Sequence, residues 1–146
     1  MASKLYTIGF TKKSARELFE LLKEHQIKKV IDIRLSNTNQ LAGFTKKNDL
    51  EYFLKEIADI KYFYVKDFAP TKELMIAKRE RKISMDKFEE EFTKILKQRK
   101  VENIFNEEEL NQACLLCSEE QAKDCHRNAI TKYLKGKYRE LEIIDI

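Results

Sequence analysis

Glycine is scarce in this chain of 146 residues, and its three glycines stand far apart, at positions 9, 43 and 136. Phosphate-binding P-loops and dinucleotide-binding loops each need several glycines close together, so both motifs are excluded. The chain also lacks any apolar run of the roughly 20 residues that span a bilayer, and its start, Met1-Ala2-Ser3-Lys4-Leu5, contains no apolar signal segment. We therefore expect a cytoplasmic protein without membrane contact.

Cysteine is scarce as well, and its count is odd: Cys114, Cys117 and Cys125 fall within twelve positions. Without a secretory signal, reduced thiols are the default. These cysteines and His126 offer enough ligands for zinc, but residues three apart on a strand face opposite ways and adjacent helical residues diverge. A thioredoxin-type pair is also disfavoured, because no helix starts at the second cysteine of Cys114-x-x-Cys117. We expect no metal and no other cofactor.

The remaining composition is that of a globular domain. Charged residues make up 37% and apolar residues 42% of the chain, and no linker or repeat divides it, so residues 1–146 are predicted to form one α/β domain. The net charge is 29 − 25 = +4. This charge permits an anionic small molecule or a nucleic acid as partner without requiring one. Nothing in the composition indicates an oligomeric state.

Strands and helices alternate in the predicted order. Strands are expected at 4–10, 29–35, 61–68, 113–117 and 141–146, and helices at 14–25, 47–58, 71–81, from 84 through 96, and at 125–136. Ser14 and Glu17 have the spacing of a capping box, Ser84 is the expected cap of the long helix, and Asp124 that of the last. Residues 36–44 are expected to form a loop, and residues 101–110 fit either a loop or a helical turn.

This alternation predicts a three-layer, Rossmann-like α/β fold, with an open, mostly parallel sheet of about five strands and helices on both faces. The simplest strand order is 3-2-1-4-5. Ligands of such sheets bind at the carboxyl edge, where the strand order changes direction. The expected crevice therefore contains Gly9, Thr11 and Lys12 on one side and residues 117–127 on the other, with Asp32 and Arg34 at its wall.

The junction between the fourth strand and the last helix is the main candidate site. A thiol at Cys125 gains thiolate character from the helix end and from Arg127, although it could also pack as a small apolar residue. His126 and Arg127 could bond loop carbonyls, but Arg127 at a helix start is also a natural clamp for an anion. Cys117 and Arg127 are ten positions apart across an acidic loop without glycine, unlike the phosphate loop of a cysteine phosphatase.

Two carboxylates near this edge allow more than one role. Glu119 could be a general base or a metal ligand, or it could orient Arg127. Asp32 and Arg34 lie one strand repeat apart and face the same side, so they form either a structural ion pair or part of the site.

Five motifs of the chain resemble the family catalogued as domain of unknown function 488. They are Tyr6-Thr7-Ile8-Gly9, Ile31-Asp32-Ile33-Arg34, Gly43-Phe44-Thr45-Lys46, Ala69-Pro70-Thr71-Lys72-Glu73-Leu74, and Leu115-Leu116-Cys117-Ser118-Glu119 through Cys125-His126-Arg127. The resemblance covers nearly the whole chain and implies an α/β fold with a shared site, but no reaction. The family usually has histidine where Phe10 stands here, and Cys114 matches none of its motifs.

Two classes of function follow. The first is an enzyme acting on a phosphorylated small molecule, a nucleotide or a nucleic-acid end. Its anion would be bound by Arg34 and Arg127, with chemistry supplied by Cys117, Glu119, His126 or Asp32. The second is a non-catalytic module that binds a nucleotide or nucleic acid in the same crevice. A deep crevice with converging titratable groups would favour the enzyme.

Overall fold

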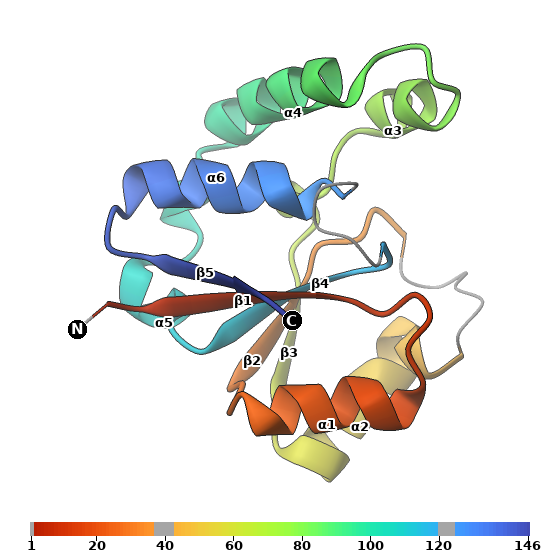
Figure 1. Ribbon diagram of the computed structural model, residues 1–146, viewed down its shortest axis with the longest axis vertical. Helices are drawn as coiled ribbons and strands as arrows, with labels where there is room; N and C mark the ends of the chain where they lie inside the picture. Colours follow the sequence, from red (N-terminus) through yellow and green to blue (C-terminus); the bar gives the residue numbers. More distant parts are fainter. Residues whose placement is uncertain (1, 37–42, 120–124) are drawn as a thin grey trace.

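The computed structural model describes residues 2–36, 43–119 and 125–146. The strands are β1 (Lys4–Gly9), β2 (Lys29–Asp32), β3 (Lys61–Tyr64), β4 (Ala113–Cys117) and β5 (Glu142–Asp145). The helices are α1 (Ala15–Glu24), α2 (Lys47–Ala58), α3 (Lys72–Arg79), α4 (Met85–Arg99), α5 (Glu107–Leu110) and α6 (Arg127–Lys137) (Figure 1). Short 3₁₀ turns cover Gly43–Thr45, Lys66–Phe68 and Val101–Asn103.

All five strands run parallel in one sheet, which confirms the α/β class. The observed order is β3-β2-β4-β1-β5, so the predicted order 3-2-1-4-5 is wrong. β4 lies at the centre and pairs with both β1 and β2. Its sequence, Ala-Cys-Leu-Leu-Cys, is buried at every position, as expected for a strand covered on both faces and both edges. The connection from β1 to β2 therefore passes over the place that β4 fills.

Helices lie on both sides of the sheet. Figure 1 shows α1 and α2 beside one face and α3, α4 and α6 beside the other. Alternate residues of β1, β2, β4 and β5 separate into two apolar clusters accordingly, because successive side chains of a strand point to opposite faces. Tyr6 and Ile8 of β1 pack with α1 and α2, whereas Leu5 packs with α4 and α6.

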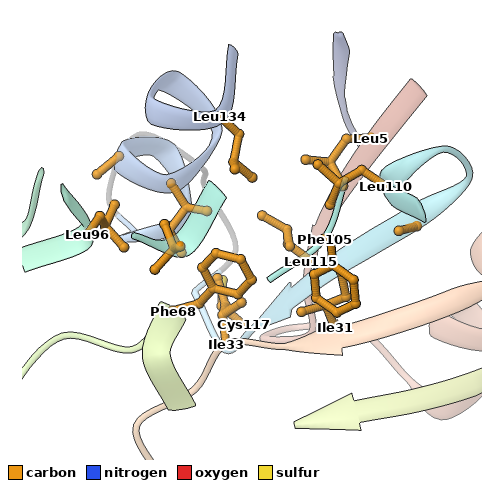
Figure 2. Packing of buried hydrophobic residues seen from close by; sticks show 14 of the residues in the cluster. Leu5, Ile31, Ile33, Phe68, Leu96, Phe105, Leu110, Leu115, Cys117 and Leu134 are labelled. Atoms are coloured by element: carbon orange, nitrogen blue, oxygen red, sulfur yellow. The ribbon is translucent and has the colours of Figure 1, made fainter. Parts of the chain in front are cut away.

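The cluster under α4 and α6 reaches the carboxyl edge of the sheet. Figure 2 shows it from close by, with Cys117 beside Ile33 and Phe68. All three side chains are almost completely buried. One wall of the candidate site is therefore continuous with the rigid core, which fixes the position of the Cys117 sulfur.

Several predicted boundaries need correction. β2 ends at Asp32 instead of 35, because the Asp32 carboxylate accepts a hydrogen bond from the backbone N–H of Arg34 and turns the chain. β3 ends at Tyr64 instead of 68, where a 3₁₀ turn begins. α6 begins at Arg127 instead of 125. The expected cap Asp124 and most of the loop expected at 36–44 lie outside the described residues.

The predicted caps of two helices, Ser14 and Ser84, are confirmed. Ser14 and Glu17 form a reciprocal capping box at the start of α1, and the Ser84 side chain accepts from the backbone N–H of Lys87 at the start of α4. Residues 101–110 resolve into a 3₁₀ turn and the short α5, which Asn106 and Glu109 cap in the same reciprocal way. Thr71 caps α3 through the backbone N–H of Leu74, so side-chain capping defines four of the described helix starts.

Candidate functional site

Three strands end side by side at the carboxyl edge. The register pairs Gly9 of β1 with Cys117 of β4, and Asp32 of β2 with Leu116 of β4. The prediction that the first and fourth strand ends meet is confirmed. Because β4 also adjoins β2, the residues that follow Asp32 lie against those that follow Cys117. Asp32 and Arg34, which were predicted to lie at the wall of the crevice, therefore lie close to its centre.

Gly9 allows the chain after β4 to cross the end of β1. A Cβ atom on Gly9 would lie 1.6 Å from the backbone oxygen of Glu119 and 2.9 Å from Nη1 of Arg127. No side chain fits such an approach, which explains the glycine. The face of Gly9 that was expected to meet a ligand is instead covered by the backbone of Glu119.

Thr11 and Lys12 extend from the same strand end. The backbone N–H of Thr11 donates to the Ser118 carbonyl oxygen at 3.0 Å, and its hydroxyl donates to the same oxygen. Lys12 is exposed and adopts a left-handed backbone, with φ 66°. Neither residue lines the small pocket described below. Their expected contact with substrate stays a prediction.

Asp32 and Arg34 form a buried ion pair at the end of β2. Their exposed fractions are 0% and 3%, and Nε and Nη2 of Arg34 donate to the two carboxylate oxygens at 2.8 Å each. The Tyr62 hydroxyl adds a hydrogen bond to the same carboxylate at 2.5 Å. Bidentate pairing holds the guanidinium in one orientation. Asp32 thus anchors Arg34 and is not among the residues that line the pocket.

The rest of the Arg34 guanidinium reaches two further elements. Nη2 also donates to the Thr45 carbonyl at 2.6 Å, and the guanidinium lies 5.4 Å from the centre of the Phe10 ring, a cation–π contact. Phe10, where the resembling family usually has histidine, therefore packs on Arg34. Nη1 is buried and has no hydrogen-bond partner among the residues that the structure describes. Such a donor is costly unless a ligand or water accepts its hydrogen bond.

Cys117 and Cys125 bring their sulfur atoms within 2.8 Å of each other, with Cys125 donating. Both side chains are 1% exposed. Nη1 of Arg127 donates to the Cys117 sulfur at 3.4 Å, and the backbone N–H of Arg127 donates to the Cys125 sulfur at 3.5 Å. Both cysteines and Cys114 are free thiols. A negative charge shared by the pair would therefore meet a guanidinium and the first turn of α6.

The pKa values separate the three thiols. Burial raises the pKa of Cys117, but the hydrogen bond from Cys125, the charge of Arg127 and the backbone hydrogen bond at Glu119 outweigh burial and bring that pKa below the ordinary thiol value. Burial and the hydrogen bond to Cys117 raise the pKa of Cys125. Burial also raises the pKa of Cys114. Cys117 is therefore the more acidic thiol of the pair.

His126 is placed to contact Cys125. Its Nε2 lies 2.7 Å from the Ile33 carbonyl oxygen, which can only accept, so Nε2 carries a proton. In the neutral ring Nδ1 then has the free lone pair, and it lies 3.8 Å from the Cys125 sulfur. The ring is 5% exposed and packs edge-on against Phe92. His126 is thus a possible proton acceptor for Cys125, held in place by backbone and core.

Arg127 lies behind the pocket. Its side chain is 3% exposed, contacts Cys117 and does not line the pocket. The expectation that it clamps an anionic ligand is not tested by this geometry. Its observed contact is with the Cys117 sulfur, and of the two buried arginines Arg34 is the one that lines the pocket.

Glu119 pairs with a residue that the sequence did not indicate. Its carboxylate lies 3.0 Å from Nζ of Lys78 on α3, so Lys78 offsets its charge. The acidic residues after β4 argued against a phosphate-binding loop, and this pairing neutralises one of them. The sequence shows that residues 71–81 are rich in Lys and Arg, but it does not show that this helix lies near the carboxyl edge.

These elements enclose a small pocket of about 160 Å³. It is lined from three sides: by the chain after β2, by the chain after β4 together with the start of α6, and by α3. The lining residues are Arg34, Leu35, Ser36, Met75, Arg79, Ser118, Glu119, Cys125 and His126. Of these, Leu35, Ser36, Met75 and Arg79 were not predicted as site residues, and Ser118 was expected in the crevice without a role of its own. The pocket has room for one small group, such as an anionic head group, and not for a drug-sized ligand.

A larger hollow of about 520 Å³ lies between α1 and α2, walled by Phe19, Phe44, Phe53 and Ile57. Its charged side chains, Arg16, Glu20 and Lys23, lie on α1, and none of the buried titratable groups converges on it. The smaller pocket is the better candidate site, because polar groups of fixed orientation meet there.

Two further observations concern metals and membranes. Among residues 2–36, 43–119 and 125–146, no group of three or more His, Cys, Asp or Glu side chains could hold a metal ion. Within the same ranges, no helix is both long and apolar enough to span a bilayer.

Comparison with known proteins gives one match. The family model described as "Domain of unknown function DUF488" matches residues 14–134, which include four of the five sequence motifs. The resemblance of the sequence motifs is confirmed. Comparisons with curated proteins and with solved structures returned no match.

Proposed function

The chain belongs to the family of unknown function DUF488, and we propose that it is an enzyme acting on a small anionic group, with a cysteine pair as its nucleophile. The substrate class is a phosphorylated small molecule, a nucleotide or a nucleic-acid end, whose anionic group enters the small pocket. The observation that carries this proposal is Nη1 of Arg34, a buried donor without a partner among the described residues, on a residue that lines the pocket.

Two cations support binding of an anion there. Arg34 is fixed by Asp32, so its unused donor is already oriented and loses little entropy on binding. Arg79 lines the same pocket from α3 and is exposed, so it can approach a ligand from the solvent side. The Glu119 carboxylate in the lining is paired with Lys78 and adds little repulsion.

The nucleophile would come from the cysteine pair. Cys125 lines the pocket, and its proton can move to the Cys117 sulfur at 2.8 Å or toward Nδ1 of His126 at 3.8 Å. The resulting charge is stabilised by the Arg127 side chain and backbone N–H. Asp32 and Arg127 then position the reacting groups without touching substrate, and His126 is the candidate proton acceptor.

A thermal-shift titration with inorganic phosphate tests the binding step. Phosphate should raise the melting temperature of the wild-type chain, since a ligand that binds only the folded state stabilises it. Arg79→Ala should keep the basal melting temperature and weaken that shift. Arg139→Ala is the matched control: it removes another exposed arginine, which precedes β5 and so lies away from the carboxyl edge, and it should keep the full shift. Equal shifts in both variants would refute the pocket as the anion site.

Phosphate release from a panel of nucleotides and sugar phosphates tests catalysis. Wild type should turn over at least one compound, and Cys125→Ser should abolish turnover while keeping the phosphate-induced shift. A wild-type chain that binds phosphate and turns over nothing in the panel would favour the alternative function, a non-catalytic module that binds nucleotides or nucleic acids.

A further inference from the structure

The cysteine pair has a second capability that does not depend on anion binding. The sulfur atoms of Cys117 and Cys125 are 2.8 Å apart, less than 1 Å beyond the bond length of about 2.05 Å in a disulfide. Cys117 is the last residue of the central strand β4, which is packed in the core, and Cys125 precedes α6. Little movement of either element is needed to join the two sulfurs.

Access to the pair is through the small pocket. Cys125 lines that pocket, whereas Cys117 lies behind it. The third cysteine offers a comparison within the same strand: Cys114 is 0% exposed and belongs to the cluster under α1 and α2, on the opposite face of the sheet. Among the described residues, the Cys114 sulfur contacts the Leu115 carbonyl and no second sulfur, and Cys114 does not line the small pocket.

The surroundings also favour ionisation of the pair. The Arg127 guanidinium and its backbone N–H each donate to one of the two sulfurs, so a thiolate forms where a resolving thiol is already in contact. A thiolate beside a second thiol favours reversible oxidation. The thiolate is oxidised to a sulfenic acid, and the second thiol converts that acid to a disulfide before it can be oxidised further.

We propose that Cys117 and Cys125 form a redox pair, which closes to a disulfide when a hydroperoxide enters the pocket and reopens with a thiol reductant. The Cys125 proton first passes to the Cys117 sulfur at 2.8 Å. The Cys125 thiolate then attacks one peroxide oxygen: an S–O bond forms, the O–O bond breaks, and the leaving hydroxide takes the proton from Cys117 and departs as water. The Cys117 thiolate then attacks the Cys125 sulfur, an S–S bond forms, and the S–O bond breaks to release hydroxide. The two sulfurs lose two electrons, which the peroxide gains.

The test uses the full wild-type chain, reduced and then freed of reductant. It is treated with graded hydrogen peroxide, trapped with N-ethylmaleimide and analysed by peptide mass spectrometry. The expected product is a linked peptide containing Cys117 and Cys125, with Cys114 still trapped as a thiol, and glutathione should restore all three thiols. In Cys125→Ser, Cys117 should give no disulfide within the chain.

Two results would overturn the proposal. One is wild-type oxidation of both cysteines to sulfinic or sulfonic acid without an intermediate disulfide; the other is oxidation of Cys114 at the same peroxide concentration as the pair. Because Cys114 serves as the control within one folded wild-type molecule, the result does not depend on whether a variant folds. A disulfide that forms in a chain without any phosphate-induced shift would support the redox pair and contradict the anion site, so the two proposals fail separately.

Discussion

The carboxyl edge of the sheet buries two arginines, and they have different kinds of partner. Arg34 is held by the carboxylate of Asp32, a permanent anion, and packs on Phe10 from the cluster under α1 and α2. Arg127 begins α6 on the other side and donates to the sulfur of Cys117, a group that is anionic only when ionised. The same side chain thus anchors the structure at one position and controls a titrating group at the other.

This difference gives the site one rigid ion pair and one group whose charge can change. A buried ion pair with bidentate hydrogen bonds fixes geometry, because breaking it leaves a charge in the protein interior. A guanidinium beside a thiol instead shifts an equilibrium between thiol and thiolate. Substitutions at the two arginines should therefore change different measured quantities.

The largest expected effect is on stability, from Arg34→Met. The Asp32 carboxylate would remain buried without its guanidinium, and the free energy of unfolding should fall by about 3–5 kcal/mol in urea denaturation. The double variant Asp32→Asn, Arg34→Met removes the charge as well and should recover part of the loss. Arg16→Ala, which breaks an exposed pair with Glu20, should change stability little. If Arg34→Met and Arg16→Ala were equally stable, Arg34 would not be a structural anchor.

The next effect concerns the space around Arg127. Gly9→Ala places a methyl group against the Glu119 backbone and the Arg127 guanidinium, and should lower stability by about 1–3 kcal/mol, the usual cost of overpacking. Gly136→Ala is the matched control, because a Cβ atom there meets nothing within 4 Å and the residue is helical. It should raise stability by about 0.5–1 kcal/mol. A neutral Gly9→Ala would mean that the chain after β4 does not cross β1 this closely.

The third effect is on reactivity. Arg127→Ala removes a charge that lowers the pKa of Cys117, so that pKa should rise. At a fixed pH below the pKa, less thiolate is present and alkylation by iodoacetamide should slow, and the whole rate-against-pH curve should move to higher pH. Arg139→Ala, which lies away from the thiols, should leave the curve in place. An unchanged curve in Arg127→Ala would place the control of Cys117 elsewhere.

The sequence predicts those features of the structure that depend on residues close together in the chain. The capping box at Ser14 and the α/β alternation are local signals, and both are confirmed. The strand order is not local: neighbouring strands in sequence need not pair in the sheet, and only the uniformly apolar sequence of β4 hinted at its central place. Because that order was wrong, β2 was expected at the wall of the crevice instead of beside β4.

The site shows the same division. Cys117, Cys125, His126, Arg127 and Arg34 were identified as candidates from their types and positions, and the structure brings them together. Arg79 and Lys78 were missed, because their approach to the edge depends on how α3 packs against α4. The close contact of Cys117 with Cys125 was equally hidden, since it depends on where α6 begins.

Protection of the cysteine pair by phosphate tests the central claim most directly, since it asks whether the anion and the thiols share one pocket. Wild-type chain would be alkylated with iodoacetamide with and without saturating phosphate, and the labelling of Cys117 and Cys125 followed by peptide mass spectrometry. Phosphate should slow labelling of the pair, and Arg79→Ala should lose this protection while Arg139→Ala keeps it. Identical labelling rates with and without phosphate would contradict an anion site served by these thiols.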